Sequence, residues 1–525
     1  MKMNFSRIMG LLALRYGDRE ALVNVERYRR FTYRELQAVT NRIANMLRGT
    51  LGLERGDNML MILDNDNLSL MHFPSTWKQE ATAVYTNFRD SLEEHTWQVE
   101  LAQPKVVFLE SEYVERYYDM LRANGCTIIA MDPIEDAPEG VLDFWTLVNA
   151  ASPEENDCEL DVHEHRSMLR FTGGTTGRGK CAMYTIDACL GCRDGMLIQP
   201  DLEMNEDMRF LHFAPLSHGS SMFYYPALFV GGTSFTQNSP DLQQWRRVVA
   251  QEKITHSFLV PTLLYRLLDL QRKDPVDLGS LRTIAYGAAP INPARLGDLV
   301  DMFGSIFLQG YGATEAMVLV SALNKRDHHS RDEGAVKRLA SAGRVTPGIE
   351  ISVLDEDGNR LPPGETGELT IRCRSLIKGY YKNPEGTAAE FVDGAWRSGD
   401  LGYIDAGGYV FIVDRKKDMI ISGGFNIYAV EVEAALGSHP AVQISAVVGI
   451  PHPDWGEAVH AEVILREGCE VTEQELMAHV KERLGGYKAP KSITLVQELP
   501  ISTVGKVVRR QVREKYWSDS KRRVS

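Results

Sequence analysis

Short hydrophobic runs alternate with amphipathic stretches over the first part of the chain. Residues 59–63, 106–109 and 127–131 are apolar runs with polar flanks, as is typical of buried parallel strands. Residues 34–47 carry apolar side chains at a spacing of three to four and predict an amphipathic helix. This alternation predicts layered α/β architecture up to about residue 160.

The pattern changes after about residue 340. Short strands at 350–354 and 368–371 flank a turn rich in Asp and Gly, which predicts a small β-barrel-like subdomain. From residue 429 the order is helix, strand, strand, helix at 473–484, and strand, which indicates a compact α+β unit. A charged run at 414–418 precedes this unit. We therefore expect a large N-terminal domain over residues 1–416 and a small C-terminal domain over 417–525.

The composition predicts a soluble globular protein with more than one core. Its 525 residues exceed the roughly 250–300 at which a single core stops growing. The net charge of −13 argues against a nucleic-acid partner, and no apolar run is long enough to span a bilayer. Seven cysteines, an odd number, fit a reduced cytoplasm better than a disulfide framework. We expect a cytoplasmic protein without a transmembrane segment.

The segment 171–180, with the sequence FTGGTTGRGK, carries the strongest local signal. Glycines let backbone N–H groups approach a phosphate closely, threonine hydroxyls donate, and cations offset the phosphate charge. The segment from Gly174 to Cys181 is one residue short of a P-loop, because Cys181 replaces the Ser or Thr whose hydroxyl ligates Mg²⁺. Residues 181–190 also lack the periodicity of a P-loop helix. A phosphate cradle of another kind is favoured over a plain loop.

Several further motifs follow this loop in a fixed order. They are QGYGATE at 309–315, SGDLG at 398–402, DRKKD at 414–418, SGGFNIY at 422–428 and STVGK at 502–506, with weaker matches at 215–219 and 287–290. The ordered set resembles the acyl-adenylating superfamily of acyl-CoA synthetases, peptide-synthetase adenylation domains and firefly luciferase. Its motifs are most similar to those of fatty-acid and other carboxylic-acid–CoA ligases. The resemblance extends from about residue 15 to about residue 510.

The resemblance implies an ATP-dependent acyl-CoA ligase that uses ATP, Mg²⁺ and CoA. The carboxylic acid would react with ATP to give acyl-AMP and pyrophosphate, and the CoA thiol would then displace AMP. The stretch 213–225 contains no acidic residue that could pair with the ammonium group of an amino acid. A fatty or other apolar acid is therefore favoured as the substrate.

The resemblance also assigns roles to single residues. Lys506 would bridge the substrate carboxylate and the α-phosphate, Thr314 would contact that phosphate, Glu315 would ligate Mg²⁺, and His218 would border the acyl group. The other residues expected at the nucleotide are Thr172, Gly173, Gly174, Thr175, Thr176, Gly177 and Lys180 at the phosphates, Gly287, Ala288, Ala289, Pro290, Gln309, Gly310, Tyr311 and Gly312 around adenine, and Asp400 and Arg415 at the ribose.

The family further implies a C-terminal domain that rotates between the two half-reactions. Lys417 would be the pivot, and Gly423, Gly424 and Phe425 would face the pantetheine arm of CoA in the second orientation. Taken singly, the glycine pair is also typical of a hairpin turn, Asp400 of a turn residue and Lys506 of a solvated lysine.

The loop departs from the family at Gly173, Gly179 and Cys181, which marks a divergent branch. Two alternatives keep adenylation but change the acceptor to a carrier-protein phosphopantetheine or to oxygen. A third is a non-catalytic protein that binds an acyl group or a nucleotide. A homodimer also stays open.

Overall fold

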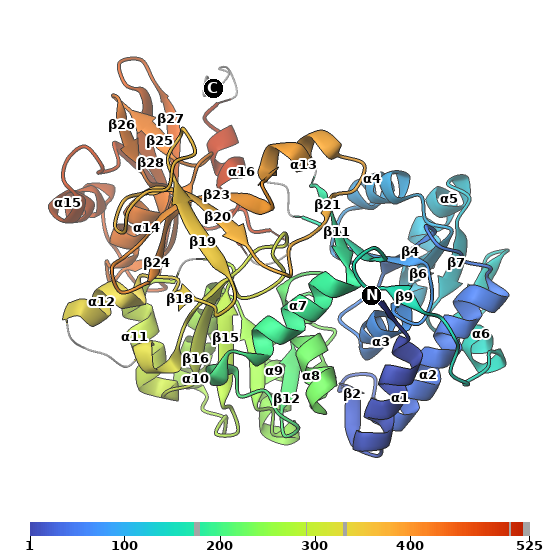
Figure 1. Cartoon of the computed structure of the whole chain (residues 1–525). Coiled ribbons are helices and arrows are strands. Elements are labelled where there is room, and N and C mark those ends of the chain that lie inside the picture. Colours follow the sequence, from blue (N-terminus) through green and yellow to red (C-terminus); the bar gives the residue numbers. More distant parts are fainter. Residues whose placement is uncertain (173–178, 290, 329–332, 503–505, 518–525) are drawn as a thin grey trace.

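The computed structural model describes residues 1–172, 179–289, 291–328, 333–502 and 506–517 (Figure 1). The chain forms a large N-terminal domain of mixed α/β structure and a small C-terminal domain. The N-terminal domain contains two large sheets and one smaller sheet, and the C-terminal domain has a sheet of its own. The expected fold class is therefore confirmed.

The first large sheet has eight strands in the order β21-β11-β10-β5-β4-β6-β7-β8. Its strands are β4 (Asn58–Ile62), β5 (Thr82–Tyr85), β6 (Val106–Leu109), β7 (Thr127–Ala130), β8 (Val141–Asp143), β10 (Arg166–Phe171), β11 (Cys181–Thr185) and β21 (Gly379–Tyr380). All of them run in the same direction except β11, which lies antiparallel between β10 and the edge strand β21. Every residue of β4 and β6 is buried, as expected for strands covered on both faces.

Five helices accompany this sheet: α2 (Tyr33–Asn45), α3 (Asn67–Thr76), α4 (Leu92–Ala102), α5 (Val114–Ala123) and α6 (Phe144–Ala150). The helix predicted at 34–47 is α2, which begins at a capping box formed by Thr32 and Glu35. Its last predicted residues belong to a π-helical turn, Met46–Thr50. A two-stranded sheet of β1 (Lys2–Met3) and β9 (Leu160–Asp161) joins the two ends of this region.

The second large sheet has nine strands in the order β18-β17-β16-β15-β14-β12-β13-β2-β3. They are β2 (Glu20–Asn24), β3 (Arg29–Thr32), β12 (Arg209–His212), β13 (Thr233–Thr236), β14 (His256–Leu259), β15 (Thr283–Gly287), β16 (Phe307–Tyr311), β17 (Ser321–Leu323) and β18 (Arg344–Val345). The helices of this part of the chain are α1 (Phe5–Tyr16), α7 (Ile186–Leu197), α8 (Tyr224–Val230), α9 (Leu242–Glu252), α10 (Pro261–Lys273), α11 (Pro293–Phe303) and α12 (Glu333–Leu339).

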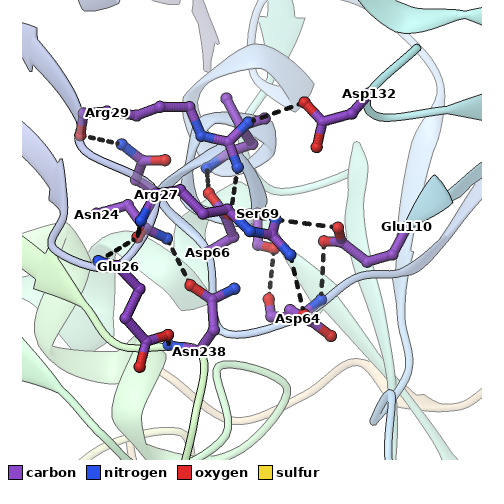
Figure 2. Close-up of polar contacts among 12 residues, drawn as sticks. Asn24, Glu26, Arg27, Arg29, Asp64, Asp66, Ser69, Glu110, Asp132 and Asn238 are labelled. Atoms are coloured by element: carbon purple, nitrogen blue, oxygen red, sulfur yellow. Dashed lines mark hydrogen bonds and ion pairs between the residues drawn. The ribbon is translucent and has the colours of Figure 1, made fainter. Parts of the chain in front are cut away.

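A cluster of charged side chains joins the two large sheets (Figure 2). Arg27 and Arg29, from the turn between β2 and β3 and the start of β3, contact acidic residues that follow β4, β6 and β7 in the other sheet. The Arg27 guanidinium lies 2.5 Å from the Asp66 carboxylate, 3.0 Å from Glu110 and 3.2 Å from Asp64. Arg29 lies 2.5 Å from Asp66 and 3.4 Å from Asp132. We call these six residues the inter-lobe cluster.

The expected β-rich subdomain is a five-stranded antiparallel sheet. It contains β19 (Glu350–Leu354), β20 (Gly367–Arg372), β22 (Phe391–Val392), β23 (Ala395–Ile404) and β24 (Val410–Arg415), with helix α13 (Pro384–Glu390) beside it. The strand predicted at 350–354 is β19.

The C-terminal sheet contains β25 (Ile420–Ser422), β26 (Phe425–Ile427), β27 (Val442–His452), β28 (Gly456–Leu465) and β29 (Ser492–Leu495). Helices α14 (Ala429–Gly437) and α15 (Glu473–Leu484) pack against it over a separate core, and α16 (Arg509–Glu514) follows. The chain passes from the third sheet to this one between β24 and β25. The division at residues 416 and 417 falls in that connection, and we retain it as a proposal.

Among the described residues, every helix is too short or too polar to cross a bilayer. All seven cysteines have free thiols.

Candidate active site

The phosphate loop connects two paired strands. Phe171 on β10 lies opposite Cys181 on β11, and the Thr172 and Lys180 backbones continue the pairing with an N–H···O distance of 2.8 Å. The Thr172 hydroxyl also accepts the Lys180 N–H at 3.0 Å. The predicted contacts of Gly173, Gly174, Thr175, Thr176 and Gly177 lie outside the described residues. Because a strand follows the loop instead of a helix, the P-loop alternative is excluded by the fold as well as by Cys181.

Lys180 points toward a pair of carboxylates (the Lys180–Glu390–Tyr380–Glu315 network). Its ammonium group forms an ion pair with Glu390 and lies 4.6 Å from the centre of the Tyr380 ring. The Tyr380 hydroxyl lies 2.8 Å from Glu315 Oε1 and 2.5 Å from Glu390 Oε2. Burial raises the pKa of Glu315, although the hydrogen bond from Tyr380 opposes that rise. The structure thus links Lys180 and Glu315 through Glu390 and Tyr380, and their roles at the nucleotide stay predictions.

Thr314 precedes Glu315 and is anchored through its backbone. Its carbonyl oxygen accepts a hydrogen bond from the buried Tyr184 hydroxyl, which comes from β11. The segment 311–315 is therefore fastened to the same strand that continues from the phosphate loop.

Asp400 contacts two other residues that are predicted to lie at the nucleotide, Tyr311 and Arg415. Its side chain is buried, the Tyr311 hydroxyl donates to Asp400 Oδ2 at 2.7 Å, and Arg415 Nε lies 3.2 Å from Oδ1. Strand pairing explains the second contact, because Asp400 on β23 is directly opposite Arg415 on β24. Burial and the neighbouring Asp400 charge raise the pKa of Tyr311, so its hydroxyl stays a donor.

Close backbone packing explains the glycines expected around adenine. A Cβ on Gly287 would lie 2.2 Å from the carbonyl oxygen of Gly310 on the neighbouring strand, and a Cβ on Gly312 would lie 2.4 Å from that of Val318. Ala288 follows the end of β15 with a φ of +67° and is exposed, and Ala289 is half-buried. Gln309 accepts a hydrogen bond from the Tyr286 hydroxyl at 3.2 Å, and Pro290 lies outside the described residues.

Lys506 reaches this site from the C-terminal domain. Burial lowers the pKa of its ammonium group to about 8; the Arg415 charge adds to this shift and the Asp400 charge opposes it. Burial also lowers the pKa of His218 to about 3, with contributions from Arg170 and Lys506. His218 is therefore a neutral imidazole at physiological pH, and its Nδ1 lies 3.0 Å from the Ser217 hydroxyl. The structure thus places His218, Asp400 and Arg415 within electrostatic reach of Lys506.

The residues expected at CoA lie elsewhere on the C-terminal domain. Gly423 and Gly424 form the turn of the β25–β26 hairpin, with φ values of +56° and +83°. Phe425 is 58% exposed, and its ring centre lies 5.3 Å from that of Tyr487. No hydrogen bond, ion pair or ring contact in the described part of the chain joins this turn to Lys506 or Asp400. Burial, and to a lesser extent the charge of Arg415, lower the pKa of Lys417, so Lys417 lies within electrostatic reach of one residue expected at the nucleotide.

Sequence reasoning missed three residues of the site: Tyr380, Glu390 and Arg170. Arg170 is buried and holds the turn that carries His218, with Nη2 donating to the Ser221 hydroxyl at 2.8 Å and Nη1 to the His218 carbonyl at 3.4 Å. Its sequence signal was a charged residue inside the otherwise apolar run before the loop. Glu390 and Lys180 are 210 residues apart and had no such signal.

Two family profiles match the chain. That of the AMP-binding enzyme family matches residues 12–381, and that of the AMP-binding enzyme C-terminal domain matches residues 431–506.

Named relatives are similar over much of the chain. Feruloyl-CoA synthase from Amycolatopsis sp is 34% identical over 92% of this chain and 94% of its own length. Medium/long-chain-fatty-acid–CoA ligase FadD8 of Mycobacterium tuberculosis is 39% identical over 68% of this chain, a match that spans only 62% of that relative.

A solved structure extends the likeness to three dimensions. ATP-bound MatB from Rhodopseudomonas palustris is 27% identical, with a TM-score of 0.86 over 98% of this chain and 99% of its own. The TM-score against apo MatB is 0.77, with 98% of this chain and 99% of that chain covered.

The fold and the two-domain site define an adenylate-forming enzyme. The chain belongs to the AMP-binding enzyme family, within the acyl-adenylating superfamily, and is an acyl-CoA synthetase of the AMP-forming kind.

Proposed function

We propose that the protein activates a fatty or other apolar carboxylic acid as its acyl-adenylate and then transfers the acyl group to CoA. The observation that carries this proposal is that Lys506, buried and on the C-terminal side of the chain, lies within electrostatic reach of His218, Asp400 and Arg415. A lysine so placed can offset the charge of a nucleotide bound by these residues.

In the first half-reaction two anions must meet, a carboxylate and the α-phosphate. The Lys506 ammonium offsets both charges where water is partly excluded. Losing one such contact costs about 2.7–4 kcal/mol in comparable sites. Arg170 fixes the turn of His218, which as a neutral ring borders the reacting groups without adding charge. Asp400 accepts from the ribose hydroxyls, since an ionised carboxylate only accepts hydrogen bonds.

Glu315 is the residue proposed to ligate Mg²⁺. Carboxylate oxygens are ligands that this hard cation prefers, so the residue fits. No group of three or more His, Cys, Asp or Glu side chains able to hold a metal occurs among the described residues. Glu315 would therefore share the cation with phosphate oxygens of ATP. When bound, Mg²⁺ supplies positive charge that helps pyrophosphate leave.

The nucleophile of the second half-reaction is proposed to be the CoA thiol. Five of the seven protein cysteines are buried, and burial raises their pKa values, which suppresses the reactive thiolate (Cys126, Cys158, Cys181, Cys189 and Cys192). CoA brings its own thiol, so none of these cysteines is needed.

Rotation of the C-terminal domain about Lys417 is part of the proposal. Lys506 lies within electrostatic reach of Arg415 and Asp400, whereas no contact among the described residues joins the Gly423–Gly424 turn to them. The chain is also more similar to ATP-bound MatB than to apo MatB, by 0.86 against 0.77 in TM-score. Both observations support an orientation suited to adenylation, from which the glycine turn would move in for thioester formation.

The identity of the acid is the part to test first. Relatives are named for medium- and long-chain fatty acids, for ferulate and for 2-succinylbenzoate, so acids of all three types belong in the panel. Acyl-CoA formed from ATP, each acid and CoA would be measured with the purified protein. Selective turnover of one apolar acid supports the proposal, and turnover only of amino acids contradicts it. Repeating the assay with a holo-carrier protein in place of CoA separates the alternative acceptor.

A further inference from the structure

Glu390 occupies a position at the nucleotide site that no motif accounts for. It is the last residue of α13, and its carboxylate forms the ion pair with Lys180. Tyr380 comes from β21, which pairs with β11 directly after Lys180, so its ring lies under the ammonium group. Two carboxylates, one phenol and one ammonium group therefore meet at the base of the phosphate loop.

The two carboxylates of this network share one hydroxyl donor, that of Tyr380. The single Tyr380 hydroxyl proton can be donated to Glu315 or to Glu390, but not to both at once. Trp396 offers Glu390 only a long contact of 3.5 Å. When both carboxylates are ionised, Glu315, Glu390 and Lys180 together carry one net negative charge. A triphosphate that approaches alone would meet a cation already engaged and a carboxylate that repels it.

The ion pair is also weak enough to exchange. The side chains of Lys180 and Glu390 are 35% and 32% exposed. An ion pair as exposed as this one changes a folding or binding equilibrium constant by about fivefold or less. A charge-assisted hydrogen bond to a phosphate changes the binding constant by roughly tenfold or more. Lys180 would accordingly leave Glu390 when a triphosphate binds.

We infer that Glu390 is a further positioning residue of the nucleotide site. It holds Lys180 in the free protein and releases it to the triphosphate; it then joins Glu315, through the shared Tyr380 hydroxyl, in facing the Mg²⁺ that accompanies ATP. This inference rests on the proposed function and extends it, because it makes one carboxylate oppose the binding of free ATP and favour that of Mg·ATP.

The test measures binding of ATP by calorimetry, with excess EDTA and with excess Mg²⁺, in the absence of acid and CoA. In Glu390→Gln we expect metal-free ATP to bind a few-fold more tightly and Mg·ATP about tenfold more weakly, the size of one charge-assisted contact. A residue with only a structural role would change both affinities in the same direction.

Two further variants sharpen the result. Tyr380→Phe keeps the ring and the Lys180–Glu390 pair, so it should weaken Mg·ATP binding and leave metal-free ATP unchanged. Glu385→Gln, an exposed position on the same helix, is the matched control and should change neither.

Two outcomes distinguish a failure of this inference from a failure of the proposed function. Wild-type protein that prefers Mg·ATP, with an unchanged preference in Glu390→Gln and Tyr380→Phe, would overturn the inference alone. Wild-type protein that binds ATP under neither condition would overturn the proposed function and the inference together.

Discussion

Two clusters of opposite charges lie in this protein, and only one of them contains lysines. The inter-lobe cluster uses two arginines against four carboxylates, and Asp66 at its centre is fully buried (Figure 2). Besides the Arg415–Asp400 pair, the nucleotide site contains Lys180, paired with Glu390, and Lys506, for which no ion pair with a carboxylate occurs among the described residues.

The difference matches what each cluster has to do. An arginine fork contacts several carboxylates in one fixed plane, and Arg27 reaches three acidic residues at once. A lysine is a point charge on a flexible stem and can change partners at small cost. The inter-lobe cluster is therefore suited to fixing two sheets, and the lysines to meeting a ligand. Substitutions in the first should reduce stability, and those in the second should reduce chemistry.

Lys506→Ala should have the largest effect. We expect adenylate formation, measured in single turnover, to fall about 10²–10³-fold, because the charge that bridges two anions is lost. Supplied acyl-adenylate should still react with CoA at close to the normal rate. Lys515→Ala, a half-exposed lysine paired with Glu462 on the same domain, should leave both steps intact. A normal adenylation rate in Lys506→Ala would refute the role assigned to this lysine.

Asp66→Ala should reduce stability instead of chemistry. The variant breaks two buried ion pairs at once, but Arg27 keeps Asp64 and Glu110 and Arg29 keeps Asp132, so we expect the lower end of the about 3–5 kcal/mol that a broken buried pair typically costs. In a calorimetric melt, the midpoint temperature of the first unfolding transition should be lower than in the wild type. Asp132→Ala removes a rim carboxylate that is 45% exposed and should cost about 1 kcal/mol or less. If the two variants lost the same stability, the burial of a carboxylate would not determine what its removal costs in this cluster.

Gly424→Leu should impair thioester formation more than adenylation, by about tenfold if the side chain narrows the path of the pantetheine arm. The φ of +83° makes any side chain there strained, so the control must share this strain. Gly468→Leu does so, with a φ of +75° and open space around it on the same domain. If the two variants lose thioester formation equally, the glycine turn has no special part in that step.

The pH dependence of adenylation gives a smaller effect of defined sign. Lys506 must be protonated to act, and its pKa is lowered to about 8. The kcat/KM for adenylation, which reports pKa values of the free enzyme, should therefore be at its maximum below that pH and decline as the pH rises through it, about twofold at the pKa itself. Lys506→Arg should remove this decline, whatever its absolute rate, because a guanidinium stays charged. A profile that is flat in the wild type up to pH 10 would contradict this assignment.

The sequence predicted elements where local pattern and tertiary structure agree. The helix expected at 473–484 is α15, because a capping box at Thr472 and Glu475 marks its start and Gly485 follows its end. The strand at 106–109 is β6, because both of its faces are buried. The motifs likewise led to Asp400, Glu315 and Lys180; the structure gives each of these side chains a polar partner, and their roles stay predictions.

What the sequence could not show depends on pairings between distant segments. The order of strands in the nine-stranded sheet joins residues 20–24 to 233–236, and no local pattern encodes that neighbour. Glu390 meets Lys180 only because β21 adds to the edge of the first large sheet beside β11. The inter-lobe cluster was missed for the same reason, since its arginines and acids look like ordinary surface charges in the sequence.

The most direct measurement is the identity of the nucleotide products. Purified protein, ATP, Mg²⁺ and an accepted acid should yield AMP and pyrophosphate in amounts that depend on the acid, with acyl-CoA appearing once CoA is added. Formation of ADP and orthophosphate, independent of the acid, would contradict the account.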